Sequence, residues 1–120
     1  MEENTVKYKS YAFALRMIKA YKFITSEQRE FTLSKQMLRS GTAIGALIRE
    51  AEHGESKADF IHKLSIALKE ANETEYWLML LHDSDYIDDN SFSLIIDDCQ
   101  ELIKMLISII KTSKHNNAKH

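Results

Sequence analysis

The residues best suited to chemistry lie in two four-residue segments, each of which begins with an acidic residue and ends with a histidine. Glu50-Ala51-Glu52-His53 has the Glu-x-x-His spacing of di-iron helical bundles, and Asp59-Phe60-Ile61-His62 is a looser version. A di-iron site also needs these side chains to face inward and to meet carboxylates from two other helices. Glu50 and His53 fall away from the apolar stripe of their helix, beside a turn. We therefore interpret them as solvated charges and predict no metal site.

Two other polar features also favour a structural interpretation. The segment 83–89 has aspartates spaced as in a calcium loop, but it lacks the mid-loop glycine and the closing glutamate, so a solvated helix-capping loop is favoured. Glu75 and His82 fall on the core side of one helix. We favour core polar groups bonded to a tyrosine or an arginine over an acid–base pair. No nucleotide-binding, zinc or nucleophile motif is present, so we predict no enzyme, cofactor or small-molecule substrate.

The stretch 34–50 carries the central packing element. Its apolar residues recur at helical spacing, yet Gly41 and Gly45 lie inside it. A glycine within a helix costs up to about 1 kcal/mol relative to alanine, and the chain has only three. We therefore predict that another helix packs closely against Gly41 and Gly45.

Length and composition predict one helical domain. The chain has 120 residues, no proline and 44% hydrophobic residues, which favours long uninterrupted helices. Cys99 is the single cysteine, which suits a reducing cytosol. No signal peptide or membrane-length apolar run is present, so a cytoplasmic location without membrane contact is expected.

Apolar periodicity predicts an all-α, antiparallel up-down-up-down four-helix bundle over residues 1–112. The expected helices cover residues 5–24, 32–52, 57–83 and 91–112. A capping box at Thr25 and Gln28, a stop at Gly54 and a cap at Ser56 mark the boundaries, and Ser91 or Asn90 caps the last helix. The segment 113–120 has no apolar period and is expected to be a disordered tail.

The charges are unevenly distributed. Residues 1–50 carry nine Lys/Arg against five Asp/Glu, and residues 51–120 carry seven against thirteen, for a net charge of −2. The two halves could pair within one chain or between subunits. Tyrosines alternate with lysines in the first helix, which indicates either core tyrosines with solvated lysines or nucleic-acid contact. The candidate nucleic-acid contacts are Lys9, Arg16, Lys19, Lys35, Arg39 and Arg49.

Two helices have more apolar surface than one bundle core requires. The surplus is expected at Val6, Phe13 and Ile24 in the first helix and at Ile66, Trp77 and Leu80 in the third. The predicted oligomer interface comprises Phe13, Ile66, Glu73, Trp77 and Leu80. Antiparallel pairing of the second and third helices also predicts an ion pair between Arg39 and Glu70 or Glu73.

The segment Gln36-Met37-Leu38-Arg39-Ser40-Gly41-Thr42-Ala43-Ile44-Gly45-Ala46, followed by Glu50, resembles the signature of the four helix bundle protein family. Members of this family were first noticed inside intervening sequences of 23S ribosomal RNA genes. The third helix is similar too, from Asp59 to Leu78, and the match covers about residues 8–106. Leu47 departs from the pattern, because many relatives carry asparagine there.

The resemblance implies a ring-shaped homopentamer, and most members have no established activity. A related branch, the accessory variability determinants of retroelements, binds nucleic acid through strongly basic surfaces, whereas this chain is net negative. We therefore expect a non-enzymatic homo-oligomeric interaction protein. The alternative is an RNA-binding accessory factor associated with ribosomal RNA insertions or a retroelement.

Overall fold

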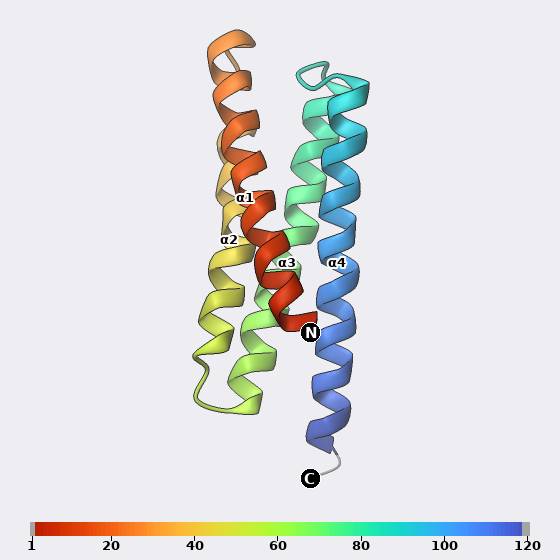
Figure 1. Ribbon diagram of the computed structural model, residues 1–120. Coiled ribbons are helices and arrows are strands. Elements are labelled where there is room, and N and C mark those ends of the chain that lie inside the picture. Colours follow the sequence, from red (N-terminus) through yellow and green to blue (C-terminus); the bar gives the residue numbers. More distant parts are fainter. Residues whose placement is uncertain (1, 119–120) are drawn as a thin grey trace.

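Four helices make up most of the structure. The computed structural model describes residues 2–118, and the side chains of residues 5–116. Over that range the helices are α1 (Glu2–Glu27), α2 (Leu33–Glu52), α3 (Lys57–Asp83) and α4 (Asp89–Ala118). Each helix packs on the next, α4 also packs on α1, and the chain direction alternates between successive helices (Figure 1). The predicted all-α four-helix fold is confirmed.

The ends of α3 agree with the sequence prediction. The Ser56 hydroxyl accepts a hydrogen bond from the Asp59 N–H at 3.0 Å, which caps the first turn. Before it, α2 ends at Glu52, and the Gly54 N–H donates to the Ala51 carbonyl at 3.0 Å. Gly54 does not have a positive φ. A Cβ there would lie 3.1 Å from the Asp59 carboxylate, so close packing favours glycine at this turn.

The predicted capping box at Thr25 and Gln28 is wrong. α1 continues through this segment to Glu27. The Thr25 hydroxyl donates back to the Tyr21 carbonyl at 2.8 Å, and the Ser26 hydroxyl donates to the Lys22 carbonyl at 2.7 Å. Both hydroxyls therefore bond within the last turns of α1 and open no new helix.

Glu30 caps α2 instead. Its carboxylate accepts hydrogen bonds from the backbone N–H groups of Thr32, Leu33 and Ser34, at 3.0, 2.8 and 2.8 Å. Desolvation alone would raise the pKa of Glu30, but these backbone bonds outweigh it and lower the pKa. A negative charge at a helix N-terminus also interacts favourably with the helix dipole. The start of α2 is thus held by a residue three positions before it.

The predicted boundaries of the last helix are also corrected. Asp88, and not Ser91 or Asn90, is the cap, because its carboxylate accepts the Ser91 N–H at 2.7 Å. That bond lowers the pKa of Asp88. The helix continues to Ala118, and Ser113 is buried, so residues 113–118 are helical where a disordered tail was predicted. Residues 119–120 of that tail lie outside the described residues.

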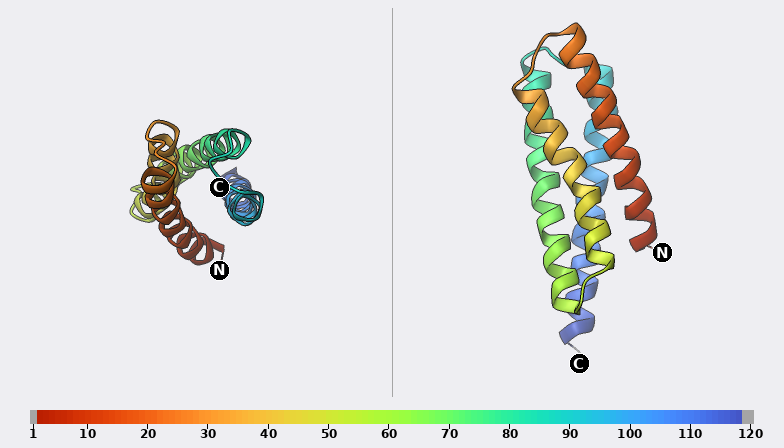
Figure 2. Two further views of the ribbon diagram at one scale, coloured as in Figure 1. Left: turned by 90° about the horizontal axis from the view of Figure 1, so that it is seen from above. Right: turned by 90° about the vertical axis from the view of Figure 1, so that its left-hand side faces the viewer.

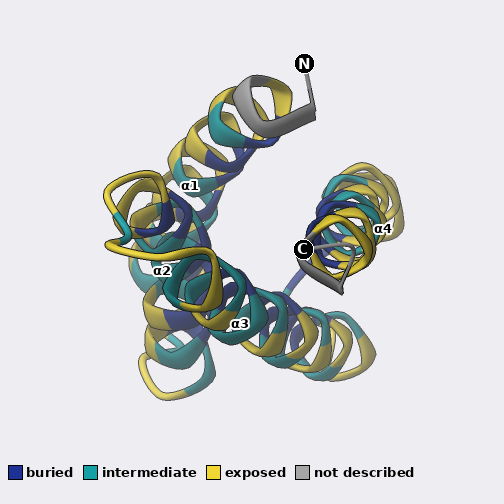
Figure 3. Cartoon of the chain, turned by 90° about the horizontal axis from the view of Figure 1, so that it is seen from below, coloured by how far each residue is buried: buried dark blue, intermediate teal, exposed yellow. Residues whose placement is uncertain are grey.

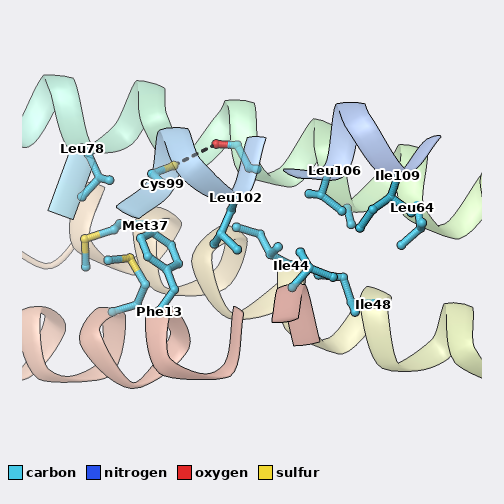
Figure 4. Close-up of a cluster of buried hydrophobic side chains, with 14 of the residues drawn as sticks. Phe13, Met37, Ile44, Ile48, Leu64, Leu78, Cys99, Leu102, Leu106 and Ile109 are labelled. Carbon is cyan, nitrogen blue, oxygen red and sulfur yellow. Dashed lines mark hydrogen bonds between the residues drawn. The ribbon is translucent and has the colours of Figure 1, made fainter. Parts of the chain in front are cut away.

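The hydrophobic core runs along the bundle axis. Figure 4 shows Phe13 of α1, Met37 and Ile44 of α2, and Leu102 of α4 meeting in its middle. The Cys99 thiol donates to the Ala71 carbonyl at 3.4 Å across the α3–α4 contact (Figure 4). Burial, then the nearby Glu75 and Asp98 charges, raise the pKa of Cys99 to about 12, so the thiol stays protonated.

α1 packs directly on the two glycines of α2. A Cβ added at Gly41 would lie 2.5 Å from Cγ and 2.8 Å from Sδ of Met17, which is fully buried. A Cβ at Gly45 would lie 3.3 Å from the Ser10 hydroxyl, a tight but adjustable contact. The close approach of a second helix is therefore present at both positions, and only Gly41 leaves no room for a methyl group.

Substituting the two glycines should separate their roles. Gly41→Ala gains up to about 1 kcal/mol of helix propensity. It forces Met17 from its place at about 1–3 kcal/mol, so with the full propensity gain the free energy of unfolding should fall by up to about 2 kcal/mol. Gly45→Ala should leave it unchanged or raise it by up to about 1 kcal/mol. Chemical denaturation at one protein concentration, followed by circular dichroism, measures both. Equal effects of the two substitutions would contradict a special constraint at Gly41.

Candidate interaction surfaces

α1 presents a second apolar face to solvent. Tyr8, Tyr11, Leu15 and Ile18 follow at helical spacing, and all are exposed, from 73% at Tyr8 to 39% at Ile18. Figure 3 shows the exposed side of α1 directed away from the other helices. No Asp, Glu, Lys or Arg interrupts this stripe, which we call the α1 outer face. Four large apolar side chains in a row form a surface of the kind that proteins bury against a partner.

The sequence prediction chose the wrong stripe of α1. Val6, Phe13 and Ile24, expected as surplus surface, are at most 2% exposed and belong to the core. Phe13 is therefore not an interface residue. The rotation of α1 about its axis follows from Met17, which must face Gly41 and so directs the Phe13 side inward. The interpretation of the tyrosines as core residues is also wrong for Tyr8 and Tyr11, because both are exposed.

The other predicted interface residues lie along α3 where it borders α2. Ile66, Glu73, Trp77 and Leu80 are all half-buried within the single chain. The Trp77 indole N–H donates to the Glu73 carboxylate at 3.0 Å, and the Tyr76 ring stands edge-on to Trp77 at 5.1 Å. Tyr76 and Met79 of α3 are more exposed than the four predicted interface residues.

Arg39 joins α2 to this part of α3, as predicted. Its guanidinium pairs with Glu70 at 3.3 Å and with Glu73. The hydrogen bond from the Trp77 indole, followed by the Arg39 charge, lowers the pKa of Glu73. Because Arg39 and Glu73 are both substantially exposed, the pair contributes less than about 1 kcal/mol to stability.

Half of the candidate nucleic-acid residues already have acidic partners. Lys9 pairs with Glu101 of α4 at 3.0 Å, Arg16 pairs with Asp98 of α4, and Arg39 pairs with α3. Lys19, Lys35 and Arg49 have no ion pair within residues 5–116. The Arg49 guanidinium lies 5.8 Å from the centre of the Tyr11 ring, a cation–π contact. Two basic residues of α1, Lys9 and Arg16, are thus neutralised by acidic residues of α4 within one chain.

Glu75 and His82 do not come together. Glu75 accepts a hydrogen bond from the Gln100 amide at 2.9 Å. The His82 ring lies between two aspartates, with Nε2 2.7 Å from Asp89 and Nδ1 3.0 Å from Asp83, and it stacks on Phe92 at 4.1 Å. Neither residue bonds to the tyrosine or arginine that was predicted. The hydrogen bonds with Asp89 and then Asp83 raise the pKa of His82.

The candidate metal residues are dispersed. Glu50 is exposed and pairs with Lys63 at 3.1 Å. In the part of the chain that the structure describes, no cluster of three or more His, Cys, Asp or Glu side chains could hold a metal ion.

A groove that was not predicted from the sequence lies between α1 and α4. It has a volume of about 370 Å³ and is lined mainly by apolar side chains from residues 16–24 and 86–95. Phe23 and Leu94 on its walls are more than half exposed. Figure 2 shows α1 and α4 diverging along this side of the bundle. Periodicity could not find the groove, because it depends on the separation of two helices remote in sequence.

A comparison with known families decides the relationship. The family model described as 23S rRNA-intervening sequence protein matches residues 2–108. The chain belongs to this family. A solved structure from Bacteroides thetaiotaomicron, described as a protein with unknown function from the S23 ribosomal protein family, is similar at 59% identity and a TM-score of 0.91. That likeness covers 92% of this chain and 99% of the other.

The intervening-sequence family brings no established activity to this chain. No curated protein matches it. None of the helices within residues 2–118 is long and apolar enough to cross a membrane.

Stability should depend on pH through His82. Its folded pKa is raised, so its contribution is fully present below the unfolded-state pKa of about 6.5 and is lost as pH rises through the folded value. His82→Gln should therefore lower the melting temperature more at pH 5.5 than at pH 8.5. Asp89→Asn should remove the larger share of this pH-dependent contribution, because Asp89 is the main cause of the raised pKa and Asp83 remains. A melting-temperature difference that is constant across this range would contradict the assignment.

Proposed function

We propose that this protein is a non-enzymatic, homo-oligomeric interaction protein of the cytoplasm. The α1 outer face carries the proposal, because it places Tyr8, Tyr11, Leu15 and Ile18 in solvent along one side of a single helix. Burying such a face against another copy removes apolar surface from water at about 25 cal/mol per Å². Tyrosine is also among the residues that contribute most at protein interfaces.

A closed ring is the favoured assembly, with five subunits as the family resemblance implies. The half-buried Ile66, Trp77 and Leu80 of α3 lie on the opposite side of the bundle from the groove between α1 and α4. A subunit with different apolar surfaces on different sides associates head to tail, and such contacts close into rings when the rotation permits. The internal pairing of Lys9 and Arg16 leaves apolar contact as the main driving force.

RNA binding is the second candidate, and one observation favours it. Exposed Tyr11 lies against Arg49, and exposed Tyr8 precedes it by three residues on the same helix, a combination able to stack on bases and contact phosphates. Lys19 and Lys35 would add charge. This surface should bind RNA more weakly than a dedicated site, because Lys9, Arg16 and Arg39 are paired with carboxylates and the chain has a net negative charge.

Leu15→Glu tests self-association. An ionised carboxylate in the centre of a buried apolar contact should cost at least about 2 kcal/mol per interface, enough to dissociate the oligomer at micromolar concentration. Leu15 lies in solvent within one chain, so the helical circular dichroism should remain. Light scattering behind size exclusion gives the mass of the wild type and the variant.

Ile107→Glu is the matched control, since Ile107 is an exposed apolar residue of α4 outside the α1 outer face. It should assemble as the wild type does. A wild-type chain that is monomeric at micromolar concentration would overturn the proposed function. An oligomeric wild type with an equally oligomeric Leu15→Glu variant would remove α1 from the interface.

A salt titration tests the RNA alternative. Labelled structured RNA should bind at low salt and lose affinity steeply as salt rises, because binding releases counterions from phosphates. Arg49→Ala should weaken that binding, whereas Lys104→Ala, on the far half of α4, should not. No binding at low salt would end the RNA alternative and leave the self-association proposal untouched.

A further inference from the structure

The groove between α1 and α4 is an unfilled apolar site at the end of the bundle that carries the α1–α2 and α3–α4 turns. Its apolar walls are formed by Phe23, Ile24, Tyr86, Ile87, Leu94 and Ile95. Phe23 is 53% exposed and Leu94 is 59% exposed, so no side chain of the same subunit covers them fully. The groove volume of about 370 Å³ is ample for one aromatic side chain.

The groove is acidic on the side of the α3–α4 turn, whereas Arg16 and Lys19 line its α1 side and Arg16 is already paired with Asp98. Asp88 lines the groove itself, and an adjoining hollow that shares Phe23, Tyr86 and Ile87 also contains Asp85. Both carboxylates are exposed. Asp88 is held by the Ser91 N–H, and Asp85 has a left-handed backbone with φ 69°. A basic group on a partner that approaches the turn side would therefore meet the carboxylates of Asp85 and Asp88.

A complementary projection occurs on the α1–α2 turn. Phe31 is 55% exposed, and the Arg29 guanidinium lies 6.0 Å from its ring centre. The turn is ordered on both sides: the Gln28 and Glu30 N–H groups bond to the Ile24 carbonyl, and the Glu30 carboxylate holds the first turn of α2. A projection that is already ordered loses little conformational entropy on binding.

The turn and the groove lie at the same end of the bundle, as Figure 1 shows for the α1–α2 and α3–α4 connections. The turn joins α1 to α2, whereas the groove separates α1 from α4. Phe31 does not line the groove of its own chain. Projection and groove therefore occupy different sides of α1 at the same level, which allows each copy to receive the projection of the next.

We infer that Phe31 of one copy inserts into the α1–α4 groove of the next copy, with Arg29 facing Asp85 and Asp88. This inference rests on the proposed self-association and assigns its contact surfaces. Leu15 and Phe23 lie eight residues apart on one side of α1 with Lys19 between them, so the α1 outer face and the groove adjoin along the same side of the helix. Because the two contact surfaces differ, the association is head to tail.

Two single substitutions and their mixture test the insertion. Phe31→Glu removes the projection, and Leu94→Glu places a charge in the groove wall; each should weaken association by about 30-fold or more. Both residues are exposed, so both variants should retain helical circular dichroism. Mixed in equal amounts, they should form dimers but nothing larger, because the mixture restores one intact projection–groove contact per pair. Light scattering distinguishes monomer, dimer and the wild-type assembly.

The outcomes separate this inference from the proposed function. A monomeric wild type overturns both. An oligomeric wild type whose two variants still assemble overturns the insertion alone and leaves the groove to a different partner. A 1:1 mixture that stays monomeric also overturns it. Ile107→Glu serves as the control and should assemble normally. If either glutamate variant loses helicity, Phe31→Ser or Leu94→Ser replaces it with the same expected outcomes.

Discussion

The contact of Met17 with Gly41 determines which surfaces the molecule exposes. α1 has two apolar faces, and either could in principle line a bundle core. Only one orientation places Met17 over the bare backbone of Gly41, where a Cβ would lie 2.5 Å from its Cγ. That orientation buries Phe13 and leaves Leu15 and Ile18 in solvent. One glycine in α2 thereby favours the orientation that leaves this face of α1 in solvent.

Electrostatics then limits what that surface recognises. The basic residues of α1 are the obvious phosphate ligands in the sequence, but Lys9 and Arg16 reach across to carboxylates of α4. Surface pairs of this kind add little stability. Their consequence is functional: they remove positive charge from the region beside the α1 outer face. An apolar face with few free cations suits a protein partner better than a nucleic acid.

Local signals in the sequence predict where the helices lie along the chain, but they do not predict the rotation of each helix about its own axis. Ser56, Asp59 and the apolar period of α3 define its boundaries, since cap and period act within a few residues. The cap of α2 by Glu30 could not be predicted from local rules, because Glu30 lies two residues before the N-cap position. The cap of α4 is Asp88, although Asn90 and Ser91 nearby are equally common capping residues. The exposed face of α1 could not be chosen from period alone, because both stripes are apolar. The choice requires Met17 and Gly41 to be considered as a pair across two helices.

Small residues explain why the bundle is open on one side. Gly41 lets α1 approach α2, the Thr74 hydroxyl donates to the Ser40 hydroxyl at 2.9 Å between α2 and α3, and Ala71 lets the Cys99 thiol reach a backbone carbonyl between α3 and α4. Between α1 and α4, Lys9 and Arg16 make ion pairs through long side chains, which span a wider separation. Closing that side would require small residues in place of Phe23 and Leu94. Those two side chains line the groove within one chain and supply apolar walls that an aromatic side chain from a second copy would contact.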